Sequence, residues 1–437
     1  MSLFSWTERP AAALQGGGVI APDERLPWAQ TAAMGVQHVI AMFGATVLAP
    51  ILMGFDPNLA IFMSGIGTLI FYFITGGKVP SYLGSSFAFI GVVIAATAYA
   101  GKGPNANIAV ALGGIIVCGL VYTLIGALVQ AIGTGWIERL MPPVVTGAVV
   151  AVIGLNLAGV PVKNMAASNF DSWMQLVTFV CVALVAVFTR GMLQRLLILV
   201  GLLLATLIYL VLANGMGLGK PMDFSGIAAA AWFGMPHFTA PVFDGNAILL
   251  IAPVALILVA ENLGHIKAVT AMTGRNLDRY MGRAFIGDGV ATMVSGAAGG
   301  TGVTTYAENI GVMAATRVYS TAAYWVAGAV AIALSLCPKV GAAISAIPPG
   351  VLGGATVVLY GLVGVLGVRI WLTNQVDFGK PVNQMTAAVA LIIGIADFTW
   401  HIGSLTFTGI ALGSIGALVI FHGMRGLTAL RDRLGPT

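Results

Sequence analysis

Apolar segments long enough to cross a lipid bilayer follow one another along almost the whole chain. A transmembrane helix needs about 20 mostly apolar residues, and the polar connections between the segments are short. Hydrophobic residues make up 58% of the 437 residues and charged residues only 8%, whereas charged residues make up about 25% of soluble domains. The sequence therefore predicts an all-α polytopic membrane protein. Fourteen spans are predicted, at residues 29–53, 58–76, 80–100, 107–132, 141–160, 173–189, 196–214, 246–266, 284–299, 302–316, 319–337, 347–368, 384–400 and 405–424.

One stretch rich in glycine and hydroxyl groups interrupts this apolar pattern around the tenth segment. It runs from Gly299 to Gly311, carries Glu308 beside Asn309, and continues to Arg317. Backbone that leaves a helix at membrane depth is tolerated only where protein buries it or where it lines a cavity. We therefore expect a binding site at this break.

The basic residues sort to one side of the predicted spans. With the N-terminus inside the cell, the cytoplasmic connections hold 16 of the 20 basic residues, and the opposite side holds Lys102, Lys163, Lys220 and Lys339. Cytoplasmic loops carry an excess of Lys and Arg, so an even number of spans with both termini cytoplasmic is expected. Residues 1–26 lack the compact apolar core of a cleavable signal. The same loop bias explains the net charge of +5, and no nucleic-acid partner is expected.

The cysteines and the known catalytic motifs give no sign of an enzyme or a metal centre. Cys118, Cys181 and Cys337 are dispersed over apolar segments, which argues against a disulfide framework and against a metal site. The sequence contains neither a His-Glu-x-x-His nor a Gly-x-Ser-x-Gly motif. We therefore expect no enzymatic activity and no bound cofactor.

Two echoes about half a chain apart indicate an internal repeat. Met141-Pro142-Pro143 recurs as Ile347-Pro348-Pro349, and Ser85-Ser86-Phe87-Ala88 recurs as Thr304-Thr305-Tyr306-Ala307. Such short patterns also recur by chance in low-complexity apolar sequence. Together with the sorting of basic residues, the echoes favour seven spans that are duplicated. Because seven is odd, the two halves must be inverted relative to one another, as in many secondary transporters.

The second echo gives the break in the tenth span a partner in the third span, at residues 82–89. Serine, threonine and aromatic residues favour extended backbone, and the residues after each stretch are compatible with a helix. We therefore predict a short strand leading into a half-helix in spans 3 and 10. The free N–H groups and positive ends of the two half-helices would face each other across a cavity.

Few ionisable side chains lie inside the predicted spans, and each is a candidate functional group. Glu261 and His265 are four residues apart in the eighth span, and therefore on one helical face, where the alternative is a structural hydrogen-bonded pair. Glu308 lies at the break in the tenth span, where it can also cap the half-helix that follows. Gln37 and His38 lie in the first span, and each can instead bond to neighbouring backbone.

Two further acids are expected to have ordinary structural roles. Asp288, in the ninth span, lies close to Arg283 and to the basic loop before it, so we expect a solvated or paired carboxylate. Asp397 lies beside Trp400 and His401 near the end of the thirteenth span, at an expected membrane interface.

Two carboxylates and free backbone N–H groups around a dry cavity suit a small, flat, nearly neutral ligand. The carboxylates accept hydrogen bonds from ring N–H groups, and the backbone N–H groups donate to ring carbonyls. Leaving either kind of group unpaired in a buried site costs roughly 1–3 kcal/mol. Phe87, Tyr306 and Tyr360 are candidates for aromatic walls. Buried carboxylates and histidines can exchange protons near neutral pH, which suits proton-coupled uptake.

At this point the sequence resembles the nucleobase–ascorbate transporter family. The run from Glu308 to Arg317 fits the family signature (Gln/Glu/Pro)-Asn-x-Gly-x-x-x-x-Thr-(Arg/Lys/Gly) at every fixed position. The family's Gln-His pair is present as Gln37-His38, and residues 260–265 resemble its eighth-span motif. Similarity to bacterial uracil and pyrimidine permeases extends through residues 41–48 and 82–90, so it covers nearly the whole chain in order.

The resemblance implies a 7+7 inverted repeat that is divided into a core domain and a gate domain. Spans 1–4 and 8–11 would form the core, and spans 5–7 and 12–14 would form the gate. The implied division is a tail at 1–26, core at 27–132, gate at 133–245, core at 246–345, gate at 346–424 and a second tail at 425–437.

The resemblance also implies the roles of individual residues. Glu261 and Glu308 would contact the nucleobase, and the backbone N–H groups of Phe87 and Ala307 would donate to its carbonyls. His265, with the two glutamates, would take part in proton coupling. The pocket would also be lined by Tyr306, Ala45 and Tyr360, and it would be supported by Gln37, His38 and Asn309. Uracil permeases have glycine where Ala307 stands, and a residue that contributes only backbone should tolerate alanine.

The expected function is import of uracil or a related pyrimidine nucleobase across the bacterial inner membrane, coupled to the proton gradient by alternating access. The partners are then the nucleobase and the lipid bilayer, with a possible homodimer through the gate domain. One alternative is a purine permease of the same family for xanthine or urate. The other is an anion exchanger or channel with the same 7+7 fold, although an acid at the half-helix end would repel an anion.

Overall fold

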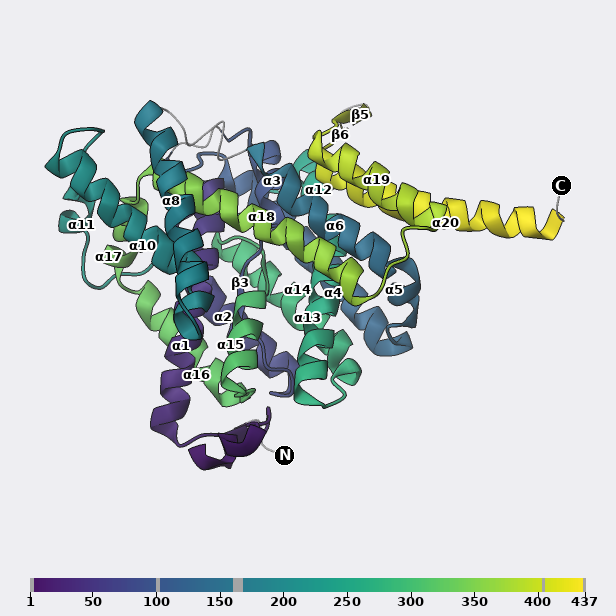
Figure 1. Ribbon diagram of the computed structural model, residues 1–437, viewed down its shortest axis with the longest axis horizontal. Helices are drawn as coiled ribbons and strands as arrows, with labels where there is room; N and C mark the ends of the chain where they lie inside the picture. The colour runs from purple at the N-terminus through teal and green to yellow at the C-terminus, as the bar shows by residue number, and fades with distance from the viewer. Residues whose placement is uncertain (1–3, 100–102, 160–167, 403–404, 435–437) are drawn as a thin grey trace. The chain divides into compact units, whose positions relative to one another are not determined.

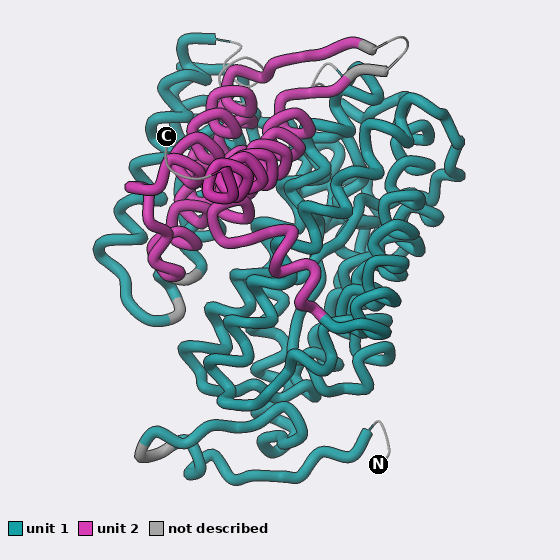
Figure 2. Tube along the Cα trace, turned by 90° about the vertical axis from the view of Figure 1, so that its right-hand side faces the viewer, with its two compact units in different colours: residues 1–133, 161–356 teal, residues 134–160, 357–437 magenta. Residues whose placement is uncertain are grey.

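The computed structural model describes residues 4–99, 103–159, 168–402 and 405–434, and most of them are helical (Figure 1). Lys102 and Lys163, which entered the sorting of basic residues, lie outside the described residues. The chain divides into two compact units (Figure 2). Unit 1 contains residues 1–133 and 161–356, and unit 2 contains residues 134–160 and 357–437. Each unit is described by itself.

Unit 1 contains most of the helices and the strand pair at the candidate site. Its helices are α1 (Trp28–Met53), α2 (Pro57–Thr75), α3 (Phe89–Thr97), α4 (Ile108–Ile132), α8 (Asn169–Phe188), α9 (Met192–Arg195), α10 (Leu197–Leu210), α11 (Ser225–Ala229), α12 (Gly245–Ile251), α13 (Val254–Thr273), α14 (Met281–Ala298), α15 (Ala307–Thr316), α16 (Thr321–Ser335) and α17 (Pro338–Ser345). Its strands and short turns of other helix types are β1 (Thr7–Glu8), η1 (Ala11–Gly17), β2 (Glu24–Arg25), β3 (Leu83–Ser85), η2 (Val211–Gly215), η3 (Asp278–Tyr280) and β4 (Val303–Thr305).

Within unit 1, α4 and α14 pack closely because glycines face the neighbouring backbone. A Cβ atom added to Gly119 would lie 2.6 Å from the carbonyl oxygen of Gly289, and one added to Gly126 would lie 2.6 Å from the backbone nitrogen of Ile286. Small residues let helix backbones approach in this way inside a membrane. The close approach brings the side chains of α4 and α14 into one buried layer.

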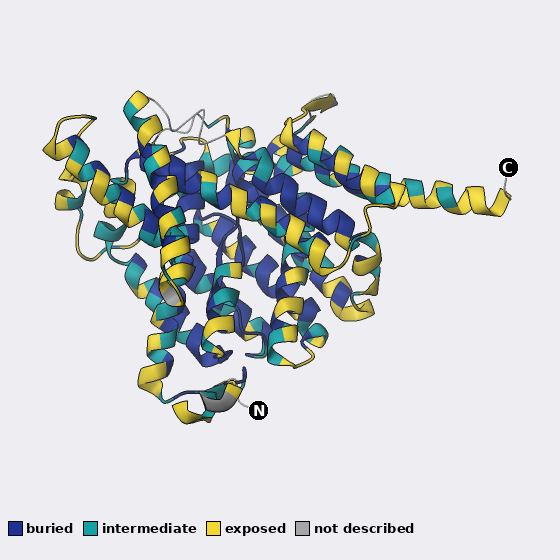
Figure 3. Ribbon diagram, in the orientation of Figure 1, coloured by how far each residue is buried: buried dark blue, intermediate teal, exposed yellow. Residues whose placement is uncertain are grey.

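The short strands β3 and β4 pair antiparallel inside unit 1. Leu83 pairs with Thr305, Gly84 with Thr304, and Ser85 with Val303. Every residue of both strands is buried (Figure 3). The strands therefore lie where the sequence analysis expected extended backbone, and each is followed in the chain by a short helix, α3 or α15.

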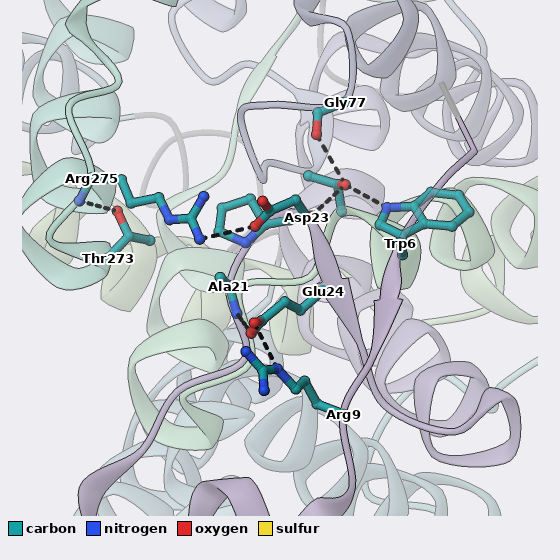
Figure 4. Close-up of polar contacts among 10 residues, drawn as sticks. Trp6, Arg9, Ala21, Asp23, Glu24, Gly77, Thr273 and Arg275 are labelled. Atoms are coloured by element: carbon teal, nitrogen blue, oxygen red, sulfur yellow. Dashed lines mark hydrogen bonds and ion pairs between the residues drawn. The ribbon is translucent and has the colours of Figure 1, made fainter. Parts of the chain in front are cut away.

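A segment at the N-terminus is held against the rest of unit 1 by polar contacts (Figure 4). The indole N–H of Trp6 donates to the hydroxyl oxygen of Thr321 at 2.9 Å. The same hydroxyl lies 2.8 Å from the carbonyl oxygen of Pro22 and 3.1 Å from that of Gly77. Arg275 forms an ion pair with Asp23 at 3.0 Å. Thr321 thus joins three parts of the chain that are distant in sequence.

Unit 2 is formed by two stretches of the chain, residues 134–160 and 357–437, whose helices pack through glycine contacts. The indole N–H of Trp371 donates to the carbonyl oxygen of Val144 at 3.0 Å, and a Cβ atom added to Gly147 would lie 2.2 Å from the same indole nitrogen. Asp397 accepts hydrogen bonds from Asn156 and from the backbone N–H of Gly409, both at 3.0 Å. The elements of unit 2 are α5 (Gly135–Leu140), α6 (Pro143–Asn156), α19 (Pro381–Ile395), β5 (Trp400–Ile402), β6 (Leu405–Phe407) and α20 (Gly409–Leu434), with α18 (Pro349–Thr373) passing from unit 1 into unit 2.

Among the described residues, eight helices are long and apolar enough to cross a membrane, or nine if one bent pair counts as a single span. That pair is α16 with α17, which are bent by 78°. Each predicted span coincides with a helix or with a strand followed by a helix, but several of these helices are too short for the length criterion. The count of fourteen spans therefore stays a prediction. So does the division into core and gate, because it concerns which parts move together.

Candidate functional site

The candidate site is built on the β3–β4 pair of unit 1. Two backbone hydrogen bonds extend the pairing beyond the strands, from Ser86 N–H to the Gly302 carbonyl at 2.9 Å and from Tyr306 N–H to the Tyr82 carbonyl at 3.0 Å. Phe87 and Ala307 follow directly after the extended backbone on the two sides. The pairing therefore fixes the positions of the two backbone segments from which the sequence analysis expected N–H donors.

Both helices that follow the strands begin without a side-chain cap. The N-cap residue of α3 is Ala88 and that of α15 is Tyr306. Neither side chain accepts a hydrogen bond from a backbone N–H of the first helical turn. The first N–H groups of a helix have no partner inside the helix and carry a partial positive charge. Phe87 is partly exposed and Ala307 is exposed. This arrangement suits a ligand that offers hydrogen-bond acceptors.

Tyr306 is buried beneath this backbone and is hydrogen-bonded to it. Its hydroxyl donates to the carbonyl oxygen of Ser85 at 2.8 Å, and the side chain is 3% exposed. A Cβ atom added to Gly84 would lie 2.5 Å from both the Tyr306 ring and the Thr46 hydroxyl. Ala45 precedes Thr46 in α1 and is also buried. The structure thus brings Tyr306 and this part of α1 together around β3.

The two predicted glutamates lie on helices that contact each other. Glu261 is on α13 and Glu308 is in the first turn of α15. Both side chains are partly exposed, whereas their neighbours Asn262 and Asn309 are fully buried. Partly exposed acids on two contacting helices are available to bind a ligand or a proton.

Among the described residues, the hydrogen-bond partner of the His265 ring is Thr305 and not Glu261. Its Nδ1 lies 2.8 Å from the hydroxyl oxygen of Thr305, the last residue of β4. The Thr305 hydroxyl in turn donates to the Asn262 amide oxygen at 3.3 Å. The i to i+4 spacing therefore correctly placed His265 on the same helix as Glu261, but its partner comes from a distant strand.

The expectation for Asp288 was wrong. The sequence suggested a solvated carboxylate or one paired near Arg283, but the structure buries it away from solvent. The side chain is 0% exposed, and Oδ2 accepts from Asn262 Nδ2 at 2.6 Å and from the Tyr122 hydroxyl at 3.3 Å. Five residues along a helix correspond to a rotation of about 140°, so Arg283 and Asp288 point in different directions. The helical rotation between the two positions was a signal in the sequence that Arg283 and Asp288 do not pair.

His38 and Asn309 form the supporting contact beneath α15. The Asn309 amide nitrogen lies 3.0 Å from the His38 carbonyl oxygen and 3.1 Å from His38 Nδ1. The His38 ring also packs against the Tyr324 ring in a tilted arrangement, with 4.4 Å between ring centroids and 33° between the ring planes. Gln37 is partly exposed beside this contact. His38 of the Gln-His pair and the asparagine of the signature are thus brought together.

Tyr360 is the one predicted site residue in unit 2. It lies in α18 and is 1% exposed. Its carbonyl oxygen would lie 2.5 Å from a Cβ atom added to Gly154 in α6. The contact of Tyr360 with a ligand stays a prediction.

The fold is similar to that of solved structures of membrane proteins. A structure described as that of SLC26A9 superposes with a TM-score of 0.68 at 13% identity, over 93% of this chain and 66% of that one. The transmembrane domain of the cyanobacterium bicarbonate transporter BicA superposes with a TM-score of 0.61 at 16% identity, over 90% of this chain and 97% of that one. At such identities the likeness concerns the fold alone. The fold and the apolar helices define a multi-pass membrane protein.

The chain belongs to the permease family, whose sequence pattern matches residues 29–403. It is 64% identical over 403 residues to the protein named "Putative pyrimidine permease RutG" of Escherichia coli (strain K12), covering 92% of this chain and 91% of that one. It is 40% identical over 409 residues to a uracil permease of Escherichia coli (strain K12), covering 91% of each. A uracil permease of Paenibacillus larvae is 39% identical over 414 residues, or 92% of this chain and 96% of the relative.

These matches confirm the resemblance to the nucleobase–ascorbate transporter family. The relatives are permeases, which are transporters, and the expectation that the chain is not an enzyme is confirmed with them.

Proposed function

We propose that this protein imports uracil or a closely related pyrimidine nucleobase across the inner membrane together with protons. The observation that carries the proposal is the pairing of two partly exposed carboxylates, Glu261 and Glu308, with uncapped helix starts at a break inside the membrane-spanning part. Pyrimidine and uracil permeases are also the relatives named at 64% and 40% identity.

The chemistry of the site matches the edge of a pyrimidine ring such as uracil. Glu261 and Glu308 accept hydrogen bonds from ring N–H groups, and the N–H groups of Phe87 and Ala307 donate to ring carbonyls. Tyr306, Ala45 and Tyr360 line the pocket in this proposal. Each buried partner left unpaired would cost about 1–3 kcal/mol, so a ligand with a different order of donors and acceptors binds more weakly.

Proton coupling is assigned in this proposal to Glu261, Glu308 and His265. No cofactor is required, because the proton gradient supplies the energy. A proton on a glutamate reduces the repulsion between the two carboxylates, so binding of the proton and of the nucleobase are linked. Import then follows an elevator-like or rocking movement of the core domain against the gate domain.

The proposed architecture is fourteen spans in a 7+7 inverted repeat, with both termini in the cytoplasm and a possible homodimer through the gate. Several features support it. The Pro-Pro pairs of the first echo both stand at the start of a helix, α6 and α18. The two strands of the second echo pair with each other. In inverted-repeat transporters the substrate site lies at the interface of the two repeats, and broken helices form it.

An anion exchanger is the second candidate, because the likeness in fold to a bicarbonate transporter favours it. The first turn of α15 argues against this candidate. An anion would bind at the helix N-terminus, where Glu308 lies and would repel it.

Uptake of labelled uracil by proteoliposomes tests the proposal. Uptake should require an inward proton gradient and should be inhibited by unlabelled uracil, while thymine, xanthine and urate define the specificity. If unlabelled uracil fails to compete but xanthine competes, the protein is a purine permease. Uptake of bicarbonate that is indifferent to the proton gradient would support the anion exchanger instead.

A further inference from the structure

A chain of hydrogen bonds connects Asp288 to His265 across three elements of unit 1. It runs from Asp288 on α14 to Asn262 on α13, then to Thr305 on β4, and back to His265 on α13. The side chains of Asp288, Asn262 and Thr305 are at most 1% exposed. We propose that Asp288, acting through Asn262 and Thr305, determines which ring nitrogen of His265 carries the proton. We call this chain of hydrogen bonds from Asp288 to His265 the relay. The role of His265 in proton coupling rests on the proposed function, but the relay does not.

The direction of the chain starts at the carboxylate. The amide nitrogen of Asn262 faces Asp288 Oδ2 at 2.6 Å. The proposed role requires Asp288 to be ionised, because an ionised carboxylate only accepts hydrogen bonds and so holds the amide in this orientation. The second N–H of the same amide group points to the Tyr122 hydroxyl oxygen at 2.9 Å. Asparagine orientation is assigned from such networks. Both amide hydrogens are thereby used, and the Asn262 oxygen must face the other way, toward Thr305.

The direction then passes through the hydroxyl to the imidazole ring. Because the Asn262 oxygen is an acceptor, the Thr305 hydroxyl donates to it at 3.3 Å. The hydroxyl has only one hydrogen, so toward His265 its oxygen acts as the acceptor. Nδ1 of His265, at 2.8 Å, must therefore carry a hydrogen. In the neutral imidazole this leaves Nε2 without a proton, as an acceptor.

The groups around Asp288 come from three elements. Tyr122 on α4 donates either to Asp288 at 3.3 Å or to the Leu258 carbonyl oxygen at 3.2 Å. Glu261 on α13 is a second acid near Asp288, and its negative charge does not favour ionisation of Asp288. On the side of α2, the Phe71 ring packs against Gly287. If Asp288 is protonated, it can donate to the Asn262 oxygen after the amide turns over, and the constraint on His265 is lost.

The relay gives His265 a defined reaction with a proton. A proton that arrives joins Nε2, and the imidazole becomes an imidazolium ion while Nδ1–H keeps its hydrogen bond to Thr305. Release of the proton from Nε2 restores the neutral ring. Asp288 is thus a positioning residue, since it acts on His265 only through other groups.

Nitrogen-15 NMR of protein labelled at histidine, in lipid bilayers, tests the relay directly. The chain has five histidines, and a His265→Gln sample identifies the signals of His265. In the unchanged protein at neutral pH, Nδ1 should be protonated and Nε2 should not be. In Thr305→Val the acceptor of the Nδ1 hydrogen is lost, and the ratio of the two tautomers should shift toward Nε2–H at least about tenfold, the equivalent of 1.4 kcal/mol.

Two more variants keep the test decisive if Thr305→Val does not fold. Thr305→Ser retains the hydroxyl and should restore the Nδ1-protonated tautomer. Asp288→Asn replaces an obligatory acceptor by a group that both donates and accepts, so both tautomers should become visible. A proton on Nε2 in the unchanged protein overturns the proposal, as does a tautomer that is the same in Asp288→Asn and the unchanged protein.

The relay and the proposed transport can fail separately. If the tautomer shifts occur but the protein imports no uracil, the relay stands and the proposed function falls. If uracil is imported with protons but the His265 tautomer does not respond to the variants, the relay falls and the proposed function stands.

Discussion

The two strand–helix segments of unit 1 follow the same plan but differ at the start of the helix. The first consists of β3 and α3, and the second of β4 and α15; each strand has three residues and neither helix has a side-chain cap. By the sequence echo, Phe89 in α3 corresponds to Glu308 in α15. Phe89 is 0% exposed, whereas Glu308 is partly exposed. The first segment therefore offers backbone alone, and the second also offers a carboxylate.

The buried aromatic ring of the first segment supports the second. A Cβ atom added to Gly302, which precedes β4, would lie 2.2 Å from the Phe89 ring. The ring thus fills the space beside the backbone that leads into β4. The two segments therefore differ in role: β3 and α3 support the site, and β4 and α15 carry the carboxylate. Substitutions at matched positions of the two segments can test this difference.

The largest effect is expected from Glu308→Gln. An amide offers one acceptor oxygen where the ring N–H groups need a carboxylate, and a hydrogen bond to a charged group contributes about 1.5–3 kcal/mol. Uracil uptake should therefore fall about 10-fold to 100-fold or be lost, while the protein stays folded. The measurement is initial uptake by proteoliposomes.

Glu138→Gln is the matched control for this prediction. It removes the same charge from α5 in unit 2, and surface substitutions usually change free energies by less than about 0.5 kcal/mol. Uptake at the level of the unchanged protein in Glu308→Gln would place the reactive group elsewhere. Glu261→Gln should behave like Glu308→Gln.

Gly302→Ala is expected to have the next largest effect, this time on stability. The added methyl group would overlap the Phe89 ring, and overpacking of this kind costs about 1–3 kcal/mol. The melting temperature in detergent should fall. Gly226→Ala in α11 is the control, because nothing lies within 4 Å of a Cβ atom at that position. Equal melting temperatures for both variants would show that Phe89 does not constrain β4.

Asn309→Leu tests the support that α15 has and α3 lacks. The substitution leaves the buried His38 Nδ1 without its donor and removes a second donor from the His38 carbonyl oxygen, at a cost of about 1–3 kcal/mol. The corresponding residue of α3 is Ile90, which is fully buried and apolar, and Ile90→Val should cost about 0.5–1.5 kcal/mol. Thermal unfolding of both variants checks this order. A smaller loss in Asn309→Leu than in Ile90→Val contradicts it.

The smallest effect is expected outside the two segments, at the ion pair between Arg275 and Asp23. Both side chains are about half exposed, and exposed ion pairs contribute about 0–1 kcal/mol. Arg275→Gln should therefore change the melting temperature very little. A double-mutant cycle with Asp23→Asn measures the coupling, and a coupling well above this range would show that the N-terminal segment stabilises unit 1 strongly.

Sequence reasoning was most successful where the signal is local. Serine, threonine and aromatic residues at 82–89 and 304–308 indicated the short strands, and the four-residue spacing placed Glu261 and His265 on one helix. The partners of these side chains could not be found in this way. Thr305 is 40 residues from His265, and Asn262 is 140 residues from Tyr122.

Asp288 shows how a local argument can also mislead. Proximity in sequence to Arg283 suggested a paired acid, but the close packing of α4 against α14 buries the carboxylate beside Tyr122. That packing depends on glycines in two helices that are far apart in sequence. The exposure of Glu308 and the burial of Phe89 at matched positions likewise depend on the tertiary structure.

The pairing of β3 with β4 has a consequence for how the chain is made. Leu83 pairs with Thr305, so the ribosome must add more than 200 residues after β3 before its partner exists, which takes roughly 10–45 s at 5–20 residues per second. Until then the backbone groups of β3 have no strand to bond with, and unpaired backbone is costly inside a membrane. The N-terminal half therefore cannot complete the pairing of β3 before β4 has been made.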